Sequence, residues 1–160
     1  MYKTLFILSF IFAFSVEFAQ SQASDFVLND IDGNEVQLSD ILSKGPVFIN
    51  FWATWCKPCR QEMDEIQKLY TQYHKKGIQF IAISVDAEKS VSRVKPFIKS
   101  KNYPFIVLLD TNGDVARDYY AQAVPFSVLI NKKGEIVYTN LGYKKGDELK
   151  LEKYLKQIIK

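Results

Sequence analysis

The apolar residues of this chain fall into two kinds of pattern, and their alternation predicts the order of its strands and helices. Short unbroken apolar runs bounded by turn residues are typical of strands buried in a sheet. Apolar residues spaced three or four apart are typical of helices instead. The predicted strands are 47–52, 78–85, 105–109, 126–130 and 136–139. Helical spacing occurs from Cys59 to Gly77, over 90–101 and over 114–120.

Turn residues and caps complete this order. Residues 32–34, with the sequence Asp-Gly-Asn, separate two short alternating runs within 26–38, which predicts a β-hairpin. The loop 131–134 predicts a second hairpin between the last two strands. Asp147 is expected to cap a final helix. Four residues of that helix are expected to face inward: Leu151, Tyr154, Leu155 and Ile158. The whole order predicts an α/β fold with a central mixed sheet flanked by helices.

The first 23 residues have the pattern of a signal peptide. One positive charge precedes the apolar run Leu5–Val16, which is shorter than the roughly 20 residues that a transmembrane helix needs. Small residues then occupy the positions expected before a cleavage site, which predicts cleavage after Ala23, with Ser21 as a second possible site. An uncleaved anchor or a buried apolar helix remains an alternative, and the anchor is the one expected contact with a membrane. Residues 24–160 are expected to form a single domain outside the cytoplasm, where disulfides persist.

Composition excludes several classes of protein. The chain has 160 residues, of which 24% are charged, and a net charge of +3, which is too weak an excess to indicate nucleic-acid binding. Two cysteines exclude a scaffold with many disulfides, and one histidine excludes a histidine-rich metal site. The lysines of 144–160 alternate with an apolar stripe and indicate a solvated helix face.

The two cysteines, Cys56 and Cys59, lie between a predicted strand and the helix that follows it. Their spacing in the first helical turn brings the two sulfur atoms close enough to bond, and the helix N-terminus stabilises a thiolate. Pro58 is tolerated in a first turn because it needs no backbone N–H there. This pattern predicts a redox-active pair in which the more exposed Cys56 attacks and the deeper Cys59 resolves the mixed disulfide.

Two other uses of the pair have less support. A zinc site needs about four ligands, and beyond the cysteines the chain offers only His74 as a typical partner. A purely structural disulfide would close a very short ring and restrain little of the chain. Neither a metal nor an organic cofactor is therefore expected.

The motif VFINFWATWCKPCRQEM at 47–63, the later Val124-Pro125 and the preceding hairpin together resemble the thioredoxin superfamily. Within it, the chain is most similar to the TlpA/ResA family of extracytoplasmic thiol–disulfide oxidoreductases. The resemblance covers nearly all of 25–160. It implies a thioredoxin fold with an added N-terminal β-hairpin and a strand–helix insertion around 82–110.

The resemblance assigns roles to individual residues. Pro125 matches the cis-proline that faces the two cysteines, and the backbone of Val124 would pair with an extended substrate segment. Trp55 matches the tryptophan that shapes the contact surface beside the attacking cysteine. Lys57 adds a positive charge that would favour the thiolate, or it is simply a solvated lysine. Phe126 departs from the family pattern, and we expect its aromatic ring to narrow the substrate groove or to re-aim the bound substrate.

The sequence leaves two interpretations of the residue that would exchange a proton with the cysteines. Asn50 stands where thioredoxins carry a buried aspartate, and an amide cannot take up a proton. Glu62, three residues after Cys59, matches a glutamate of the ResA-like reductases. A carboxyl group partly removed from water near the sulfurs has a raised pKa and can move a proton to or from Cys59. The alternative is a solvated glutamate in the first turn of the helix.

The resemblance implies a reductant of protein disulfides that is re-reduced by a membrane electron donor, with cytochrome c maturation as the implied setting. One alternative is the same fold acting as an oxidant or isomerase. A peroxiredoxin-type peroxidase would need a proline and a threonine at fixed positions ahead of its cysteine. Ile49 and Ala53 occupy these positions ahead of Cys56, so the pattern is absent there. A non-enzymatic metal-binding module is the remaining alternative.

Overall fold

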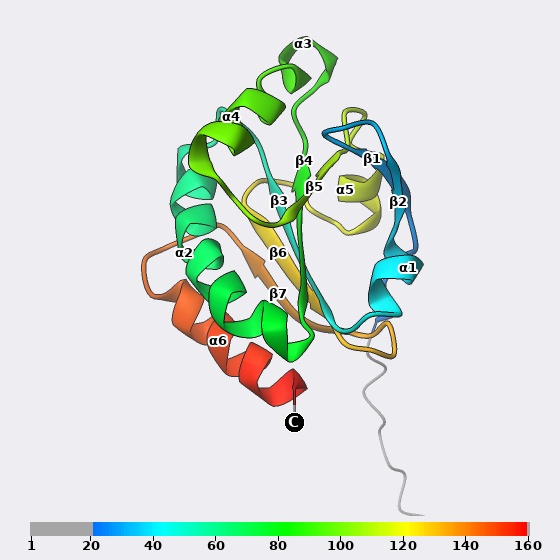
Figure 1. Ribbon diagram of the computed structural model, residues 1–160, viewed down its shortest axis with the longest axis vertical. Coiled ribbons are helices and arrows are strands. Elements are labelled where there is room, and N and C mark those ends of the chain that lie inside the picture. Colours follow the sequence, from blue (N-terminus) through cyan, green and yellow to red (C-terminus); the bar gives the residue numbers. More distant parts are fainter. Residues whose placement is uncertain (1–20, 160) are drawn as a thin grey trace, which may run out of the picture.

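The computed structural model describes residues 21–159, so most of the predicted signal peptide lies outside the described residues. The chain forms a seven-stranded sheet in the order β2-β1-β5-β4-β3-β6-β7 (Figure 1). The strands are β1 (Val27–Asp30), β2 (Glu35–Gln37), β3 (Val47–Trp52), β4 (Gln79–Ser84), β5 (Ile106–Leu109), β6 (Phe126–Ile130) and β7 (Ile136–Leu141). The helices are α1 (Leu38–Leu42), α2 (Lys57–Tyr73), α3 (Glu88–Val91), α4 (Val94–Lys101), α5 (Asp114–Asp118) and α6 (Asp147–Ile158), with a 3-10 turn, η1 (His74–Lys76), after α2.

The sheet is mixed and is covered by helices on both faces, as predicted. β3, β4 and β5 run parallel, whereas β1 pairs antiparallel with β5, and β6 pairs antiparallel with β3. Figure 1 shows α2, α4 and α6 on one side of the sheet and α1 and α5 on the other. Two hydrophobic cores fill these layers, one beneath α2, α4 and α6 and the other beneath α1 and α5. None of the helices within residues 21–159 is both long and apolar enough to cross a bilayer.

Most predicted elements are confirmed, including both hairpins and the strand at residues 47–52. The predicted helix 90–101 is instead two short helices, α3 and α4, and Pro96 lies in the first turn of α4, where its missing N–H costs no helical hydrogen bond. The predicted cap of the last helix was wrong. Gly146 is the N-cap of α6, and Asp147 is its first helical residue. Tyr154, expected to face inward, is instead 38% exposed, and its ring packs in a tilted arrangement against Tyr138 of the edge strand β7.

The first described residues pair with the loop before β7. The carbonyl oxygen of Ser21 accepts a hydrogen bond from the N–H of Ile136, and the N–H of Ala23 donates to the carbonyl of Gly134. Cleavage after Ala23 would remove Ser21 and Ala23, and with them both of these bonds. The cleavage site stays a prediction.

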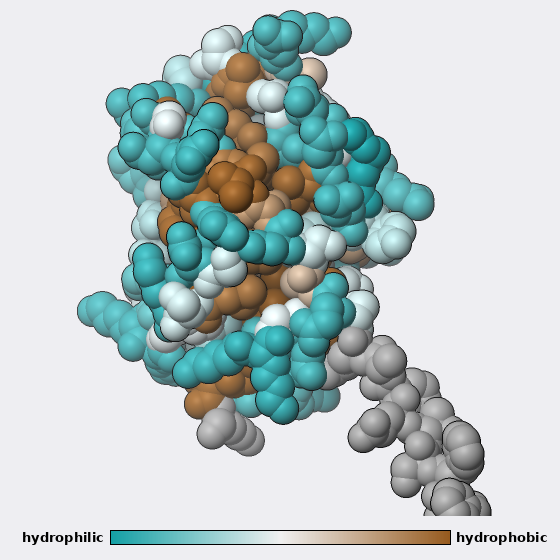
Figure 2. Space-filling model, turned by 90° about the vertical axis from the view of Figure 1, so that its right-hand side faces the viewer, coloured by the Kyte–Doolittle hydropathy of each residue, from teal (hydrophilic) through white to brown (hydrophobic). Residues whose placement is uncertain are grey.

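The surface mixes exposed apolar side chains with charged ones. Figure 2 shows hydrophobic residues gathered in an interrupted band among hydrophilic ones on the side that carries β1 and β2. Over the described chain, the exposed large hydrophobic residues are Val27, Trp55, Ile106, Tyr120, Leu141, Leu149 and Tyr154. Of these, Trp55 directly precedes the first cysteine.

Two glycines, Gly45 before β3 and Gly77 before β4, allow the chain segments that lead into these strands to approach each other closely. A Cβ atom on Gly45 would lie 2.0 Å from the carbonyl oxygen of Gly77. The N–H of Gln79 donates to the carbonyl of Pro46 at 2.8 Å. The central parallel pair therefore begins at a contact that leaves no room for a side chain. At the other end of this pair, β3 leads to Cys56 and Cys59.

Replacing Gly45 with alanine is expected to lower the free energy of unfolding by about 3 kcal/mol, because the added Cβ displaces backbone atoms and not a flexible side chain. Gly33→Ala is the matched control. Gly33 also has a positive φ, of 89°, but nothing lies within 4 Å of an added Cβ, so the expected loss is about 1 kcal/mol. Urea denaturation measures both, and equal losses would contradict the proposed contact.

Candidate active site

The cysteines lie where the central strand passes into the longest helix. β3 ends at Trp52, and Cys56 is the N-cap of α2, where its Sγ accepts a hydrogen bond from the N–H of Cys59 at 3.2 Å. Cys56 and Cys59 form a disulfide. The side chain of Cys56 is 5% exposed and that of Cys59 is fully buried. The order of depth therefore agrees with the sequence interpretation, and the free N–H groups of the helix N-terminus are close to the sulfur atoms.

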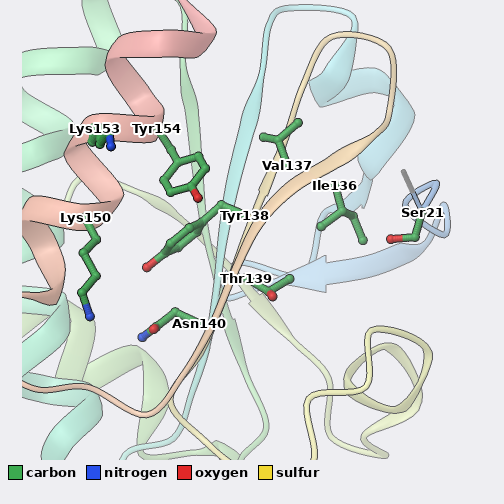
Figure 3. Close-up of a pocket in the computed structure, with 9 residues that line it drawn as sticks. All are labelled: Ser21, Ile136, Val137, Tyr138, Thr139, Asn140, Lys150, Lys153 and Tyr154. Atoms are coloured by element: carbon green, nitrogen blue, oxygen red, sulfur yellow. The ribbon is translucent and has the colours of Figure 1, made fainter. Parts of the chain in front are cut away.

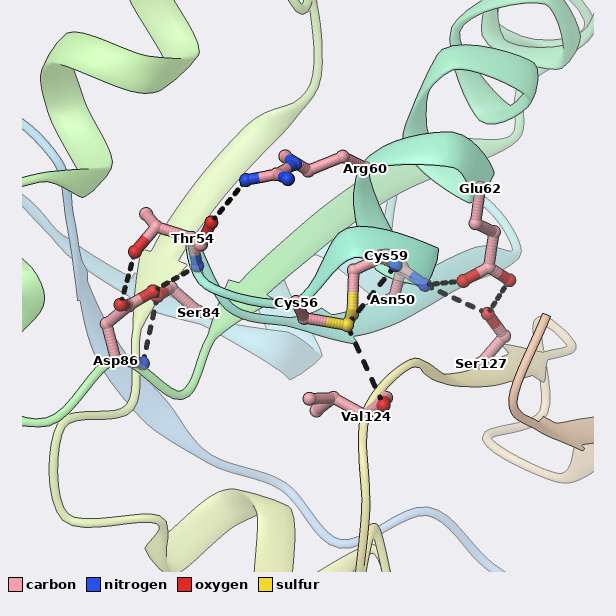
Figure 4. The surroundings of a disulfide bond; sticks show 10 residues. All are labelled: Asn50, Thr54, Cys56, Cys59, Arg60, Glu62, Ser84, Asp86, Val124 and Ser127. Carbon is pink, nitrogen blue, oxygen red and sulfur yellow. Dashed lines mark hydrogen bonds between the residues drawn. A yellow bond between two sulfur atoms is a disulfide. The ribbon is translucent and has the colours of Figure 1, made fainter.

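A buried aspartate fixes the loop that precedes Cys56. Asp86, two residues after β4, accepts hydrogen bonds from the N–H of Thr54 at 2.8 Å and from its hydroxyl at 2.6 Å (Figure 4). Ser84 donates a further bond to Asp86 at 2.9 Å, and the guanidinium of Arg60 donates to the carbonyl of Thr54 at 3.0 Å. The sequence analysis missed Asp86, although an aspartate directly after a buried strand was a usable signal.

The peptide bond between Val124 and Pro125 is cis, as the resemblance implied. The carbonyl oxygen of Val124 lies 3.7 Å from the Sγ of Cys56 (Figure 4). Val124 and Pro125 line a groove of about 470 Å³ together with Pro58, which lies between the cysteines, and the exposed Leu141. Trp55 is 64% exposed. The structure thus places the backbone before Pro125 against the first cysteine, with an open groove beside them.

Glu62 is buried, which excludes the alternative of a solvated glutamate. Its side chain is 6% exposed, and its carboxyl oxygens accept hydrogen bonds from Asn50 Nδ2 at 2.8 Å and from the hydroxyl of Ser127 at 2.9 Å (Figure 4). Burial raises the pKa of Glu62 to about 7, although the hydrogen bonds from Ser127 and Asn50 act in the opposite direction. Glu62 follows Cys59 by three positions in α2, so both side chains belong to one face of the helix.

Phe126, directly after Pro125, does not act as the sequence suggested. The ring of Phe126 packs against Phe51 at 6.2 Å between ring centres, in the core beneath α1 and α5, so it does not narrow the groove. Ser127 points to the other face of β6 and reaches Glu62. Alternation along the strand β6 was the signal that could have separated these two side chains.

A larger groove, of about 710 Å³, lies between β7 and α6 (Figure 3). Its lining contains neither a cysteine nor an acidic residue: it consists of Ser21, Ile136, Val137, Tyr138, Thr139, Asn140, Lys150, Lys153 and Tyr154. Within residues 21–159, no group of three or more histidine, cysteine, aspartate or glutamate side chains is arranged to hold a metal ion.

The raised pKa of Glu62 makes a prediction about stability. The folded protein binds the carboxyl proton of Glu62 more tightly than the unfolded chain does. The stabilisation of the folded state by this proton is therefore fully present below pH 4.5 and is lost as the pH rises to about 7. This loss is expected to be about 3 kcal/mol. Urea unfolding of the oxidised protein at several pH values, compared with Glu62→Gln, measures it. The variant should lack this part of the pH dependence, and identical curves would show that Glu62 is not buried as described.

Comparisons with known proteins agree with this geometry. The family model described as Redoxin matches residues 18–158. Thiol-disulfide oxidoreductase ResA of Bacillus thuringiensis subsp. konkukian is 39% identical over 137 residues, which cover 86% of this chain and 76% of that protein.

Solved structures show the same fold. A structure from Chlorobium tepidum, described as a candidate thiol:disulfide interchange protein DsbE, superposes with a TM-score of 0.81 and 30% identity over 88% of this chain and 97% of that one. The thioredoxin domain of a thiol-disulfide oxidoreductase from Bacteroides vulgatus superposes with a TM-score of 0.72 and 26% identity, covering 87% of this chain and 99% of that one. The chain therefore belongs to the Redoxin family and, within it, to the thioredoxin-like thiol–disulfide oxidoreductases related to ResA.

Proposed function

We propose that this protein reduces disulfides of extracytoplasmic proteins through Cys56 and Cys59. The observation that carries the proposal is the disulfide at the N-terminus of α2 with the Val124 carbonyl 3.7 Å from its first sulfur. A helix N-terminus would stabilise a thiolate on Cys56, and the backbone beside it would pair with an extended substrate.

The exchange proceeds in two displacement steps. In the reduced protein the Cys56 thiolate attacks one sulfur of a substrate disulfide, which forms a mixed disulfide and releases the other substrate sulfur as a thiolate. Cys59 then loses its proton and attacks the Sγ of Cys56, which releases the second substrate thiolate and leaves the Cys56–Cys59 disulfide. Two electrons pass to the substrate, and a second dithiol protein must return them.

Glu62 is proposed to accept the proton of Cys59. The thiol is fully buried, so its proton needs an acceptor within the protein. A carboxyl group with a pKa of about 7 is partly ionised at neutral pH and can both take up and release a proton there. Asn50, at the position of the buried aspartate of thioredoxins, donates to Glu62 and cannot replace it as the base.

The substrate is proposed to bind as an extended segment across Cys56. Backbone groups of Val124 would pair with the segment, Pro125 and the groove beside it would receive its side chains, and Trp55 would cover it from the other side. The groove of about 470 Å³ beside Pro125 and the high exposure of Trp55 support this arrangement. No metal or organic cofactor enters these steps.

The cellular setting is proposed from the sequence and from the family. Residues 1–23 would direct export, which places the domain in the periplasm or an equivalent extracytoplasmic space. A membrane protein would supply electrons to the oxidised pair, and substrates in cytochrome c maturation fit a reductant of this kind. Relatives named ResA and DsbE support a role in thiol–disulfide exchange. Use as an oxidant or isomerase is the competing proposal.

The two cysteines are expected to differ in a trapping experiment. Cys59→Ser, mixed with a small disulfide-bonded protein such as insulin, should accumulate a mixed disulfide, because the thiolate that releases the substrate is missing. Cys56→Ser is the matched control and should trap at least about tenfold less, since Cys59 is buried deeper and is the resolving sulfur. Mass spectrometry under non-reducing conditions measures the adduct. Equal trapping by both variants would contradict the assigned order of attack.

A further inference from the structure

The carboxyl group of Glu62 is surrounded by polar side chains from two strands. Asn50 of β3 and Ser127 of β6 are direct partners in the antiparallel register of these strands, and each is 1% exposed. Asn50 Nδ2 donates to Glu62 at 2.8 Å and to the Ser127 hydroxyl at 3.1 Å, and that hydroxyl donates to the second oxygen of Glu62 at 2.9 Å. The three groups form a closed ring of hydrogen bonds (Figure 4).

This ring satisfies an ionised Glu62 but leaves one buried atom without a partner. Both carboxyl oxygens of Glu62 accept a hydrogen bond, whereas Asn50 Oδ1 is buried and has none among the described residues. An unpaired buried carbonyl is unfavourable and needs a physical reason. Rotation of the Asn50 amide by half a turn would bring Oδ1 to the position of Nδ2.

The rotated amide would suit the protonated acid. Its Oδ1 would then face Glu62 and the Ser127 hydroxyl, and it could accept the proton of the carboxylic acid. One amide atom of Asn50 lacks a partner within the ring in either orientation, Oδ1 in the first and Nδ2 in the second. The choice between the two orientations therefore depends on whether Glu62 carries a proton.

We propose that Asn50 and Ser127 are positioning residues that form a hydrogen-bond switch: one arrangement holds ionised Glu62, and the other, with the Asn50 amide rotated, holds protonated Glu62. Glu62 can then take up and release a proton while its own hydrogen bonds are kept. The role of the switch in thiol–disulfide exchange rests on the proposed function, in which Glu62 accepts the proton of Cys59. The switch itself is a property of the oxidised protein as well.

Other titratable groups face Glu62 from β7, α6 and the loop between them. Tyr138, Tyr143, Asp147 and Glu148 line a small cavity of about 10 Å³ together with Glu62. The negative charge of Asp147 acts to raise the pKa of Glu62, and burial raises the pKa of Tyr138 to about 12, so this phenol stays neutral. None of these groups donates a hydrogen bond to Glu62, which separates their effect from that of the ring.

The test is a titration of Glu62 by carbon-13 NMR in the oxidised protein, where no thiol titrates. Ser127→Ala should raise the pKa of Glu62 by about one unit, because a hydrogen bond to the ionised form is lost. Ser127→Thr retains a hydroxyl and should stay close to the unmodified protein. Ser84→Ala removes a buried strand hydroxyl that donates to Asp86 instead, and it should leave the titration of Glu62 unchanged.

The side-chain amide of Asn50 supplies the second measurement. Its nitrogen-15 resonance should titrate with the same midpoint as Glu62, and the contacts between its N–H protons and Ser127 should weaken as Glu62 becomes protonated. An Asn50 amide that does not follow Glu62, or an unchanged Glu62 titration in Ser127→Ala, would overturn the switch.

The rate of mixed-disulfide resolution separates the switch from the proposed function. If both hold, Ser127→Ala moves the midpoint of the pH–rate profile as far as it moves the Glu62 titration, and Glu62→Gln abolishes that midpoint. A shifted titration with an unmoved rate profile would support the switch and contradict the assignment of Glu62 as the proton acceptor of Cys59.

Discussion

The complete burial of β3 is the constraint on which the rest of the site depends. All six of its residues are buried, and its side chains alternate between the two hydrophobic cores. A strand buried on both faces has one register that keeps apolar side chains in both cores. That register fixes Asn50 opposite Ser127, and it fixes the point at which the chain leaves the sheet for the loop and the N-terminus of α2.

Next to this buried strand, folding buries the carboxyl group of Glu62, and burial of the ionised form is unfavourable. Burial raises the pKa of Glu62, so an ionised Glu62 lowers the stability of the folded protein. The hydrogen bonds from Asn50 and Ser127 offset part of this cost. A group held in this way is suited to exchange a proton with a buried thiol near neutral pH, and the Asp86–Thr54 bonds keep the loop to Cys56 in place.

The sequence could predict the strands and helices because apolar periodicity and turn residues are local signals. It could also predict that Cys56 and Cys59 lie between a strand and the first turn of a helix, since their spacing and the buried strand before them are local signals too. The partners of Glu62 could not be found in this way. Asn50 and Ser127 become neighbours only through the pairing of β3 with β6, and nothing in a single sequence states which face of β6 carries Ser127. Alternation along β6 indicates that Phe126 and Ser127 lie on opposite faces, but it does not say which of them faces α2, and this explains the wrong placement of Phe126.

The central claim is that Cys56 and Cys59 form a reversible two-electron couple used for reduction. Equilibration of the mature domain in thiol buffers of defined potential, followed by alkylation and mass spectrometry, tests this claim most directly. The account predicts one reversible two-electron transition near the potential of thioredoxin, about −270 mV. A reversible transition near −120 mV, the value of a strong oxidant, would contradict the direction of electron flow, and the absence of any reversible transition would contradict the oxidoreductase mechanism itself.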